Sequence, residues 1–233
     1  MRSGFLLTLL AVWSTAGVAA AAPLRACTPP THVAPAPALR PPEREIVRDA
    51  PVASYMLALS WSPEWCRTRG GSAEARFQCR QNHMGFVVHG LWPNGPGKRH
   101  PRYCAPAPAI NAATVRKNYC MTPSANLLQH EWAAHGTCGW KTPEAYFDRA
   151  RAVWNAIDAP SLSFPAGKEV TAGDVRDAFL ARNRALRRNA LYVKVADGNR
   201  LQEVRICHDL RFRPAACRGG LGAPDHARIR IQH

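Results

Sequence analysis

The stretch HMGFVVHGLWPNG, residues 83–95, carries the clearest fold signal in the chain. Met84, Phe86 and Val88 fall on one side of a period of two, and the residues between them, up to His89, fall on the other. This alternation predicts a β-strand that ends at His89 and runs into a rigid turn containing Trp92. An imidazole beside an aromatic turn suits a site that binds a planar ring. A lone histidine at a strand end can also be structural, and a Trp-Pro turn can be simple core packing.

Further strands are predicted on both sides of this one. Residues 54–61, SYMLALSW, alternate bulky and small side chains, and residues 191–207 form a hairpin that turns at Asp197-Gly198-Asn199. A short final strand is predicted at 227–232, ARIRIQ. Helices are predicted in the middle of the chain. Strands at both ends with helices between them do not alternate as βαβ units do, so we expect an α+β fold with a mainly antiparallel central sheet.

Three helices follow from caps and apolar spacing. Thr142 and Pro143 begin one that continues to Ile157, and a capping pattern from Thr171 to Asp174 begins another whose apolar side reaches Leu186. A third, short helix is predicted over 127–135.

The N-terminal residues predict export. Residues 1–20 combine Arg2, an apolar run at 5–13 and small residues at 18–20, which predicts a secretory signal peptide. The apolar run is far shorter than the roughly 20 residues that span a bilayer, so we expect no membrane span. Residues 21–51 hold eight prolines and predict an extended leader. We therefore expect a secreted or periplasmic monomer with one catalytic domain over 52–233.

The cysteines predict a disulfide-stapled domain. Eight are present, an even number, and no CxxC pair points to zinc. Spacing alone leaves 105 possible pairings. They are Cys27, Cys66, Cys79, Cys104, Cys120, Cys138, Cys207 and Cys217. A lipid anchor on Cys27 is an alternative use of that residue.

Net charge is +15, which favours polyanions such as RNA, DNA, anionic lipid or cell-wall polymer as partners. Charge alone specifies no chemistry, because cationic exported proteins are common.

The segment HEWAAHGTC, residues 130–138, resembles a zinc-protease helix but has the wrong spacing. His130 and His135 are five residues apart, about 140° around a helix, so they cannot share one face as HExxH histidines do. Glu131 and His135 are four apart and do share a face. This arrangement predicts either a metal-free acid/base site or a solvated helix face with an ion pair.

Together, HGLWP at 89–93 and HEWxxHGTC at 130–138 resemble the two active-site segments of the ribonuclease T2 family of secreted, metal-independent endoribonucleases. The resemblance extends to 55–66, to 121–132 and to 201–217. It implies cleavage of single-stranded RNA with low base specificity. The products would carry a 2′,3′-cyclic phosphate, and DNA would be excluded because it lacks the attacking 2′-hydroxyl. No cofactor and no metal are expected.

The resemblance also implies residue roles. His135 is the expected general base and His89 the general acid, a pairing that two near-neutral imidazoles can perform without metal. His130 and Glu131 are expected to bind the phosphate. Trp92 is similar to the family's base-stacking residue. The remaining expected substrate contacts are Asn94, Pro123 and Ser124.

By the same resemblance, Cys104 is expected to pair with Cys138 and Cys207 with Cys217. Cys66 and Cys79 are near each other in the sequence, and Cys27 with Cys120 is then the remainder.

Two positions depart from the family pattern. Ala134 stands where a lysine usually precedes the last histidine, and Asn94 stands where an acidic residue is frequent. Loss of a charge-stabilising contact can cost on the order of a hundredfold in rate. Either activity is reduced or another cation substitutes. The candidate cations are Lys98, Arg99, Arg102 and Lys117.

Two alternatives to a nuclease remain at this stage. A binding protein could keep the fold and hold RNA or another polyanion without cutting it. A zinc hydrolase is opposed by the histidine spacing and by the even number of cysteines.

Overall fold

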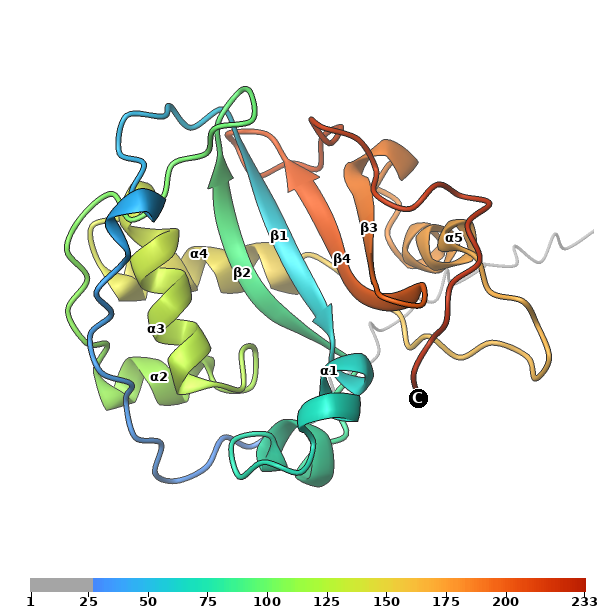
Figure 1. Cartoon of the computed structure of the whole chain (residues 1–233), viewed down its shortest axis with the longest axis horizontal. Coiled ribbons are helices and arrows are strands. Elements are labelled where there is room, and N and C mark those ends of the chain that lie inside the picture. The colour runs from blue at the N-terminus through green and yellow to red at the C-terminus, as the bar shows by residue number, and fades with distance from the viewer. Residues whose placement is uncertain (1–26) are drawn as a thin grey trace, which may run out of the picture.

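The computed structural model describes residues 27–233, and the signal peptide predicted at 1–20 lies outside the described residues. A four-stranded sheet with the order β2-β1-β4-β3 forms the centre, and all three pairings are antiparallel. The predicted α+β class with an antiparallel sheet is confirmed (Figure 1). The strands are β1 (Ser54–Trp61), β2 (Phe86–Asn94), β3 (Leu191–Ala196) and β4 (Arg200–His208).

The strand containing HGLWP is longer than predicted. β2 does not end at His89 but continues through Pro93 to Asn94, where it pairs with Ser54 at the start of β1. β2 is an edge strand, so Pro93 leaves no ladder hydrogen bond unmade inside the sheet. A register shift at Ala58/Leu59 interrupts the pairing opposite His89. Such a bulge re-aims side chains, and it explains why Val88 and Leu91, which are three residues apart, both lie in the core cluster with Leu57 and Leu59.

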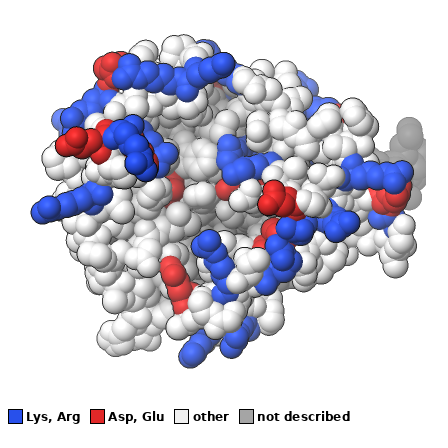
Figure 2. Space-filling view, in the orientation of Figure 1, with Lys and Arg blue, Asp and Glu red and all other residues white. Residues whose placement is uncertain are grey.

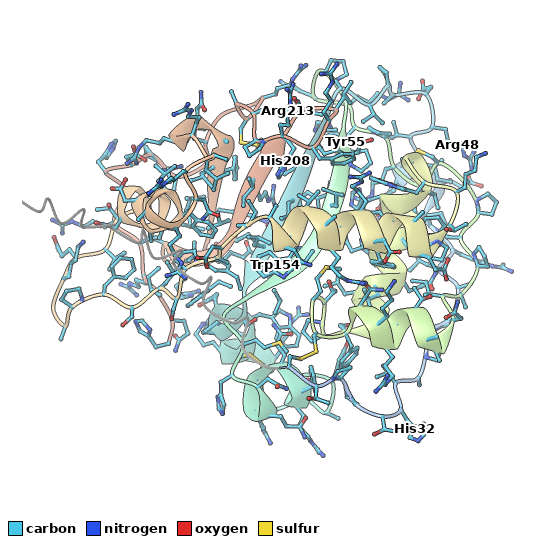
Figure 3. The ribbon with its side chains drawn as sticks, turned by 180° about the vertical axis from the view of Figure 1, so that it is seen from behind. His32, Arg48, Tyr55, Trp154, His208 and Arg213 are labelled. Atoms are coloured by element: carbon cyan, nitrogen blue, oxygen red, sulfur yellow. A yellow bond between two sulfur atoms is a disulfide. The ribbon has the colours of Figure 1, made fainter. Side chains whose placement is uncertain are left out.

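The helices cover one face and both edges of the sheet. From behind, α4 crosses the strands, while α3 lies beside β2 and α5 beside β3 (Figures 1 and 3). The regular α-helices are α1 (Ser62–Arg69), α2 (Ala112–Asn118), α3 (Ala125–Ala134), α4 (Pro143–Asn155) and α5 (Ala172–Arg182). Shorter helical turns occur at Glu43–Glu45, Arg76–Gln81, Gly136–Cys138 and Arg188–Ala190.

The two capped helices match their sequence signals. Thr142 accepts a hydrogen bond from the backbone of Ala145, and Thr171 and Asp174 form the complete capping box. α5 ends at Arg182, so Leu186 lies beyond the helix, although it is buried as expected. α1 and α2 were not predicted.

The core lies between the sheet and α4. Tyr146, Phe147 and Val153 of α4 are buried with Leu57 and Leu59 of β1 in one hydrophobic cluster. The hydroxyl of Tyr146 also accepts a hydrogen bond from the backbone N–H of Leu91 (3.1 Å). Apolar packing therefore fixes β2 against α4 on one side of the sheet and leaves the other side for polar chemistry.

The final strand predicted at 227–232 is wrong. Only isolated bridges form there, from Arg228 to Thr171 and from Arg230 to Arg200. Ile229 alone of this segment is buried, so its alternation reflects one anchoring side chain rather than a full ladder.

Four disulfides staple the domain. They join Cys27 to Cys120, Cys66 to Cys79, Cys104 to Cys138 and Cys207 to Cys217, which are the pairs named above. The Cys27 sulfur is thus used in a disulfide, which leaves no thiol there for a lipid anchor. Within residues 27–233, no helix has the length and apolar character needed to cross a bilayer.

The leader is attached to the domain. Its described part, 27–51, runs along the outer side of α2 and α3 (Figure 1). Val47 pairs with Arg102 through two backbone hydrogen bonds of 2.8 Å, and Cys27 is bonded to Cys120.

Candidate active site

A cleft of about 880 Å³ lies over the open side of the sheet, between the strands and α3. The four expected catalytic residues line it: His89 from β2, His130 and Glu131 from α3, and His135 just after α3. In the space-filling view a hollow lies in this region, and lysine and arginine side chains gather around it (Figure 2). Two segments about forty residues apart in sequence therefore meet in one cavity.

His89 is held by two carboxylates. Its Nδ1 lies 2.7 Å from Oε1 of Glu203 on β4, and its Nε2 lies 3.4 Å from Oε1 of Glu131. Burial alone would lower the pKa of His89, but the hydrogen bond to Glu203 and the charges of Glu131 and Glu203 outweigh it and raise the pKa. The hydrogen bond at Nδ1 fixes the ring and leaves Nε2 directed toward Glu131, inside the cleft.

Glu131 is buried with few partners. Oε2 accepts a hydrogen bond from the indole N–H of Trp92 (2.7 Å), whereas Oε1 is buried without a hydrogen bond. Burial raises the pKa of Glu131 to about 7, against the opposing effects of His89, the Trp92 hydrogen bond and Arg102. A carboxyl group in this state can hold or give a proton near neutral pH.

Gly90 is required by this close packing. A Cβ atom at residue 90 would collide with the Glu131 carboxylate and the Trp92 indole nitrogen. The glycine of HGLWP therefore makes room for the carboxyl group of HEW, which links the two sequence segments physically.

His135 occupies the C-terminal end of α3. Its backbone N–H donates to the carbonyl of Glu131 (3.0 Å), and its φ of −124° takes the chain out of the helix. Burial lowers the pKa of His135 well below its ordinary value, and the positive charges of Arg102 and His130 lower it further. The ring is therefore neutral at physiological pH and can accept a proton.

His130 lines the cleft and is partly buried. Its Nε2 is 4.0 Å from Oε1 of Glu131, and its ring meets the edge of Tyr103 at 6.3 Å between centroids. Burial lowers the pKa of His130, and Arg102 and His89 lower it further. His130 and His135 diverge around the helix end as their spacing predicts, yet both line the cleft.

Trp92 contacts both of the imidazoles of His89 and His135. Its ring centroid is 5.2 Å from that of His89 and 5.4 Å from that of His135. The guanidinium carbon of Arg205 lies 4.8 Å from the Trp92 centroid and 5.4 Å from that of Tyr192. One face of the indole is therefore already covered by a cation, and these groups form a row of planar surfaces.

The sheet side of the cleft contains residues that the sequence reasoning missed. Nε and Nη2 of Arg205 both donate to Oε2 of Glu203 (2.9 and 2.7 Å), and Lys194 on β3 lies 3.9 Å from Glu203. The carboxyl of Glu203 is buried, which alone would raise its pKa. The hydrogen bond and charge of His89, with Arg205, instead lower the pKa to about 2. Charged residues at alternate positions of β4, in LQEVRIC, were the available signal for a polar sheet face.

The expected substrate contacts separate into two groups. Asn94 lines the cleft near Trp92. Pro123 and Ser124 are not among the cleft-lining residues. Ser124 caps α3 by accepting from the backbone of Leu127 (3.2 Å), and its hydroxyl donates to Glu74 (2.7 Å).

Two of the four candidate cations line the cleft and two do not. Lys117 pairs with Asp148 (2.8 Å), and Arg99 pairs with Asp49 of the leader (2.8 Å), and neither lines the cleft. Lys98 and Arg102 do line it.

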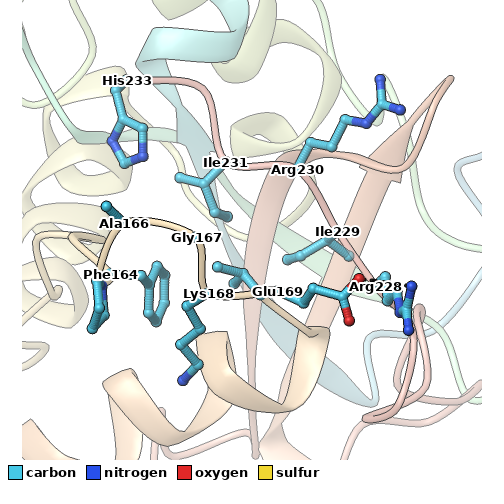
Figure 4. A pocket seen from close by; sticks show the side chains of 12 residues that line it. Phe164, Ala166, Gly167, Lys168, Glu169, Arg228, Ile229, Arg230, Ile231 and His233 are labelled. Carbon is cyan, nitrogen blue, oxygen red and sulfur yellow. Dashed lines mark ion pairs between the residues drawn. The ribbon is translucent and has the colours of Figure 1, made fainter.

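No three histidine, cysteine, aspartate or glutamate side chains of residues 27–233 are arranged to hold a metal ion. A second hollow of about 450 Å³ lies near the C-terminal end, between 164–170 and 228–233 (Figure 4). None of the expected catalytic or substrate residues lines it. His208 is buried on β4, and burial lowers its pKa to about 4, so this histidine is a neutral structural residue.

The ribonuclease T2 family model matches residues 52–217, which include both histidine segments. The chain belongs to the ribonuclease T2 family.

Relatives within the family come from bacteria, plants and animals. A probable ribonuclease of Haemophilus influenzae is 31% identical over 180 residues, covering 72% of this chain and 62% of the relative. A ribonuclease of Aeromonas hydrophila is 39% identical over 84 residues, 36% of each chain. The chain thus spans less than two thirds of either relative.

Solved structures show the same fold. Trichomaglin, described as an S-like ribonuclease, superimposes with a TM-score of 0.61 at 18% identity, covering 77% of this chain and 98% of that chain. An RNase-related protein from Calystegia sepium gives a TM-score of 0.58 at 19% identity, with 78% and 98% covered.

Proposed function

We propose that this protein is an exported, metal-independent endoribonuclease that cleaves single-stranded RNA to leave a 2′,3′-cyclic phosphate and a free 5′-hydroxyl. The observation that carries this proposal is the pair of imidazoles, His89 and His135, that line one cleft and both lie next to Trp92. Their pKa values are shifted in opposite directions, which suits one proton donor and one proton acceptor at the same pH.

In the proposed reaction, neutral His135 takes the proton from the 2′-hydroxyl, whose oxygen attacks the adjacent phosphorus. Protonated His89 gives a proton to the departing 5′-oxygen as the P–O bond breaks. One P–O bond forms as another breaks, and His135 takes up one proton while His89 releases one. Glu203 keeps His89 protonated and oriented through the 2.7 Å hydrogen bond at Nδ1.

Glu131 and His130 face the position of the phosphate. A pKa of about 7 allows Glu131 to present a proton to a nonbridging phosphate oxygen, where an ionised carboxylate would repel it. A bound phosphate would oppose the shift that now lowers the pKa of His130, because negative charge favours the imidazolium form.

Low base specificity is part of the proposal. The row formed by Trp92, Arg205 and Tyr192 offers ring and guanidinium planes, and stacking of this kind is tolerant of sequence. Arg205, Lys194 and the basic rim supply a field that attracts RNA.

The proposal is tested by the 3′ ends left on a defined single-stranded RNA in the presence of a chelator. We expect 2′,3′-cyclic phosphate ends by mass analysis and no cleavage of the same sequence with 2′-deoxy sugars throughout. Salt-sensitive retention of RNA with no new ends would instead identify a binding protein. Activity that disappears with chelator and returns with added zinc would overturn the metal-free mechanism.

A further inference from the structure

We propose that Arg102, carried to the cleft by the segment that the leader holds, is the catalytic cation that contacts the scissile phosphate on the α3 side. This inference rests on the proposed function and names a further residue for the same reaction. Charge builds on the phosphate oxygens in such a transition state, and a fixed cation stabilises it.

Position 134 cannot supply this charge in the present packing. Ala134 is 0% exposed and forms a small buried cluster with Tyr103 and Ala133, against which Leu39 and Ile46 of the leader pack. The backbone of Tyr103 also donates to the carbonyl of Ala134 (3.0 Å). A long charged side chain at residue 134 would begin beneath this apolar cover.

The covering segment brings a cation of its own. Arg102 directly precedes Tyr103, and its guanidinium carbon lies 5.1 Å from the Tyr103 ring centroid. The edge of the same ring faces His130, and Arg102 lines the cleft with His130, Glu131 and His135. The charge of Arg102 acts on all three groups: it helps to lower the pKa of His130 and of His135, and it opposes the rise in the pKa of Glu131 that burial causes.

The leader fixes the backbone of Arg102 while the head group stays reachable. Val47 exchanges two backbone hydrogen bonds with Arg102, both 2.8 Å. Glu45 of the leader pairs with the guanidinium at 3.2 Å, and both side chains are 36% exposed. A half-exposed ion pair contributes little stability, so a phosphate can compete with Glu45 for Arg102. The Nε of Arg102 is buried without a hydrogen bond, so the exposed end of the guanidinium is the part that a phosphate could reach.

Other cations at the cleft are less suited to this role. Arg205 is already bonded to Glu203 through two hydrogen bonds on the opposite, sheet side. Lys98 lines the cleft, but its side chain is exposed and its backbone is not paired with the leader as that of Arg102 is.

The test compares Arg102→Ala and Arg102→Lys with Arg99→Ala. Arg99 is a matched control because it lies in the same segment, pairs with the leader through Asp49, and does not line the cleft. We expect Arg102→Ala to lower kcat on a short defined RNA by on the order of 100-fold with a smaller change in KM. Arg102→Lys should recover about tenfold of that loss, and Arg99→Ala should stay within about twofold of wild type. Added guanidinium at concentrations well below denaturing should restore part of the Arg102→Ala activity, which loss of structure would not allow.

A second measurement does not depend on cleavage. Binding of an uncleavable 2′-O-methyl oligonucleotide should weaken in Arg102→Ala with a salt slope smaller by about one, and less so in Arg99→Ala. Wild type that cuts RNA while Arg102→Ala stays within about threefold of Arg99→Ala in kcat would overturn the inference and leave the proposed function standing. Wild type that leaves RNA intact would defeat the proposed function, and the binding comparison would still decide whether Arg102 contacts phosphate.

Discussion

Two buried carboxyl groups on opposite sides of the cleft behave in opposite ways. Glu203 on β4 is 2% exposed and Glu131 on α3 is 1% exposed. Glu203 is surrounded by His89, Arg205 and Lys194, and its pKa is lowered to about 2. Glu131 has one hydrogen bond and one unbonded oxygen, and its pKa is raised to about 7.

The difference shows how one residue type is given two tasks. On the sheet side, paired charges fix the orientation of His89 and raise its pKa. On the helix side, Glu131 is buried and its ionised form is poorly solvated, so its pKa rises into the range in which a carboxyl group can exchange a proton at neutral pH. The carboxyl group on the sheet side is therefore held by charged partners, and the one on the helix side is not.

The largest expected effect comes from removing one imidazole from each side of the cleft. We expect His89→Ala and His135→Ala each to lower kcat/KM by about 10²–10⁴, the usual value of a general acid or base. The double variant should lose far less than the product of the two, because both act in the same step. The measurement is cleavage of a defined RNA. His226→Ala, an exposed histidine that does not line the cleft, is the control and should stay near wild type. Near-wild-type rates in either single variant would contradict the assigned roles.

Glu203→Gln tests the stabilising character of the sheet side. The amide keeps the shape but leaves Arg205 without its charge partner, and breaking a buried pair costs about 3–5 kcal/mol. The pKa of Glu203 is lowered in the folded state, so its stabilising effect is present above the unfolded pKa of 4.5 and is lost as pH falls through about 2. Urea unfolding should therefore show a large difference from wild type at pH 7 and a smaller one near pH 3.

The same variant should move the pH profile of activity. Without Glu203 the raised pKa of His89 falls, so the alkaline limb of kcat/KM should shift to lower pH while the acid limb keeps its place. An unchanged alkaline limb would show that His89 does not depend on Glu203.

Gly90→Ala tests whether the two sides must touch. A Cβ at residue 90 would strike the Glu131 carboxylate, and relief requires movement of β2 or α3. We expect a loss of about 1–3 kcal/mol in unfolding free energy and reduced activity. Gly71→Ala is the matched control, because a Cβ there meets nothing within 4 Å, and it should be close to neutral. Equal thermal midpoints for both variants would mean that the contact has room to relax.

The fold was predictable where a single strand or helix carries its own pattern. The 191–207 hairpin and the two capped helices could be located because turn residues, caps and apolar spacing are local. α1 could not, because SPEWCRTR has no apolar face and follows β1 without a break. The end of β2 was misjudged because Pro93 is compatible with a strand only at a sheet edge, and edge position is not visible in a sequence.

The sequence identified the histidines of the candidate site but not the residues that hold them in place. His89, His130, Glu131 and His135 belong to two recognisable segments. The contact between His89 and Glu203 depends on β4 pairing with β1 and on the bulge in β2 at His89 itself. Long-range register of this kind leaves no trace in local spacing.

Glu131→Gln tests the helix side of the cleft and separates stability from reactivity. A carboxyl group whose folded pKa is raised costs the folded state nothing below its unfolded pKa of 4.5 and the full amount above about 7. A neutral amide removes that cost, so Glu131→Gln should be more stable than wild type at pH 8 by up to about 3 kcal/mol, a value that already includes the attraction to His89. At pH 4 the gain should vanish. The free energy of unfolding is measured by urea titration at pH 4 and pH 8. The control is Glu144→Gln, which changes an exposed carboxyl group whose pKa is lowered. A variant less stable than wild type at pH 8 would mean that Glu131 is ionised and well paired, and that the two sides of the cleft do not differ as described.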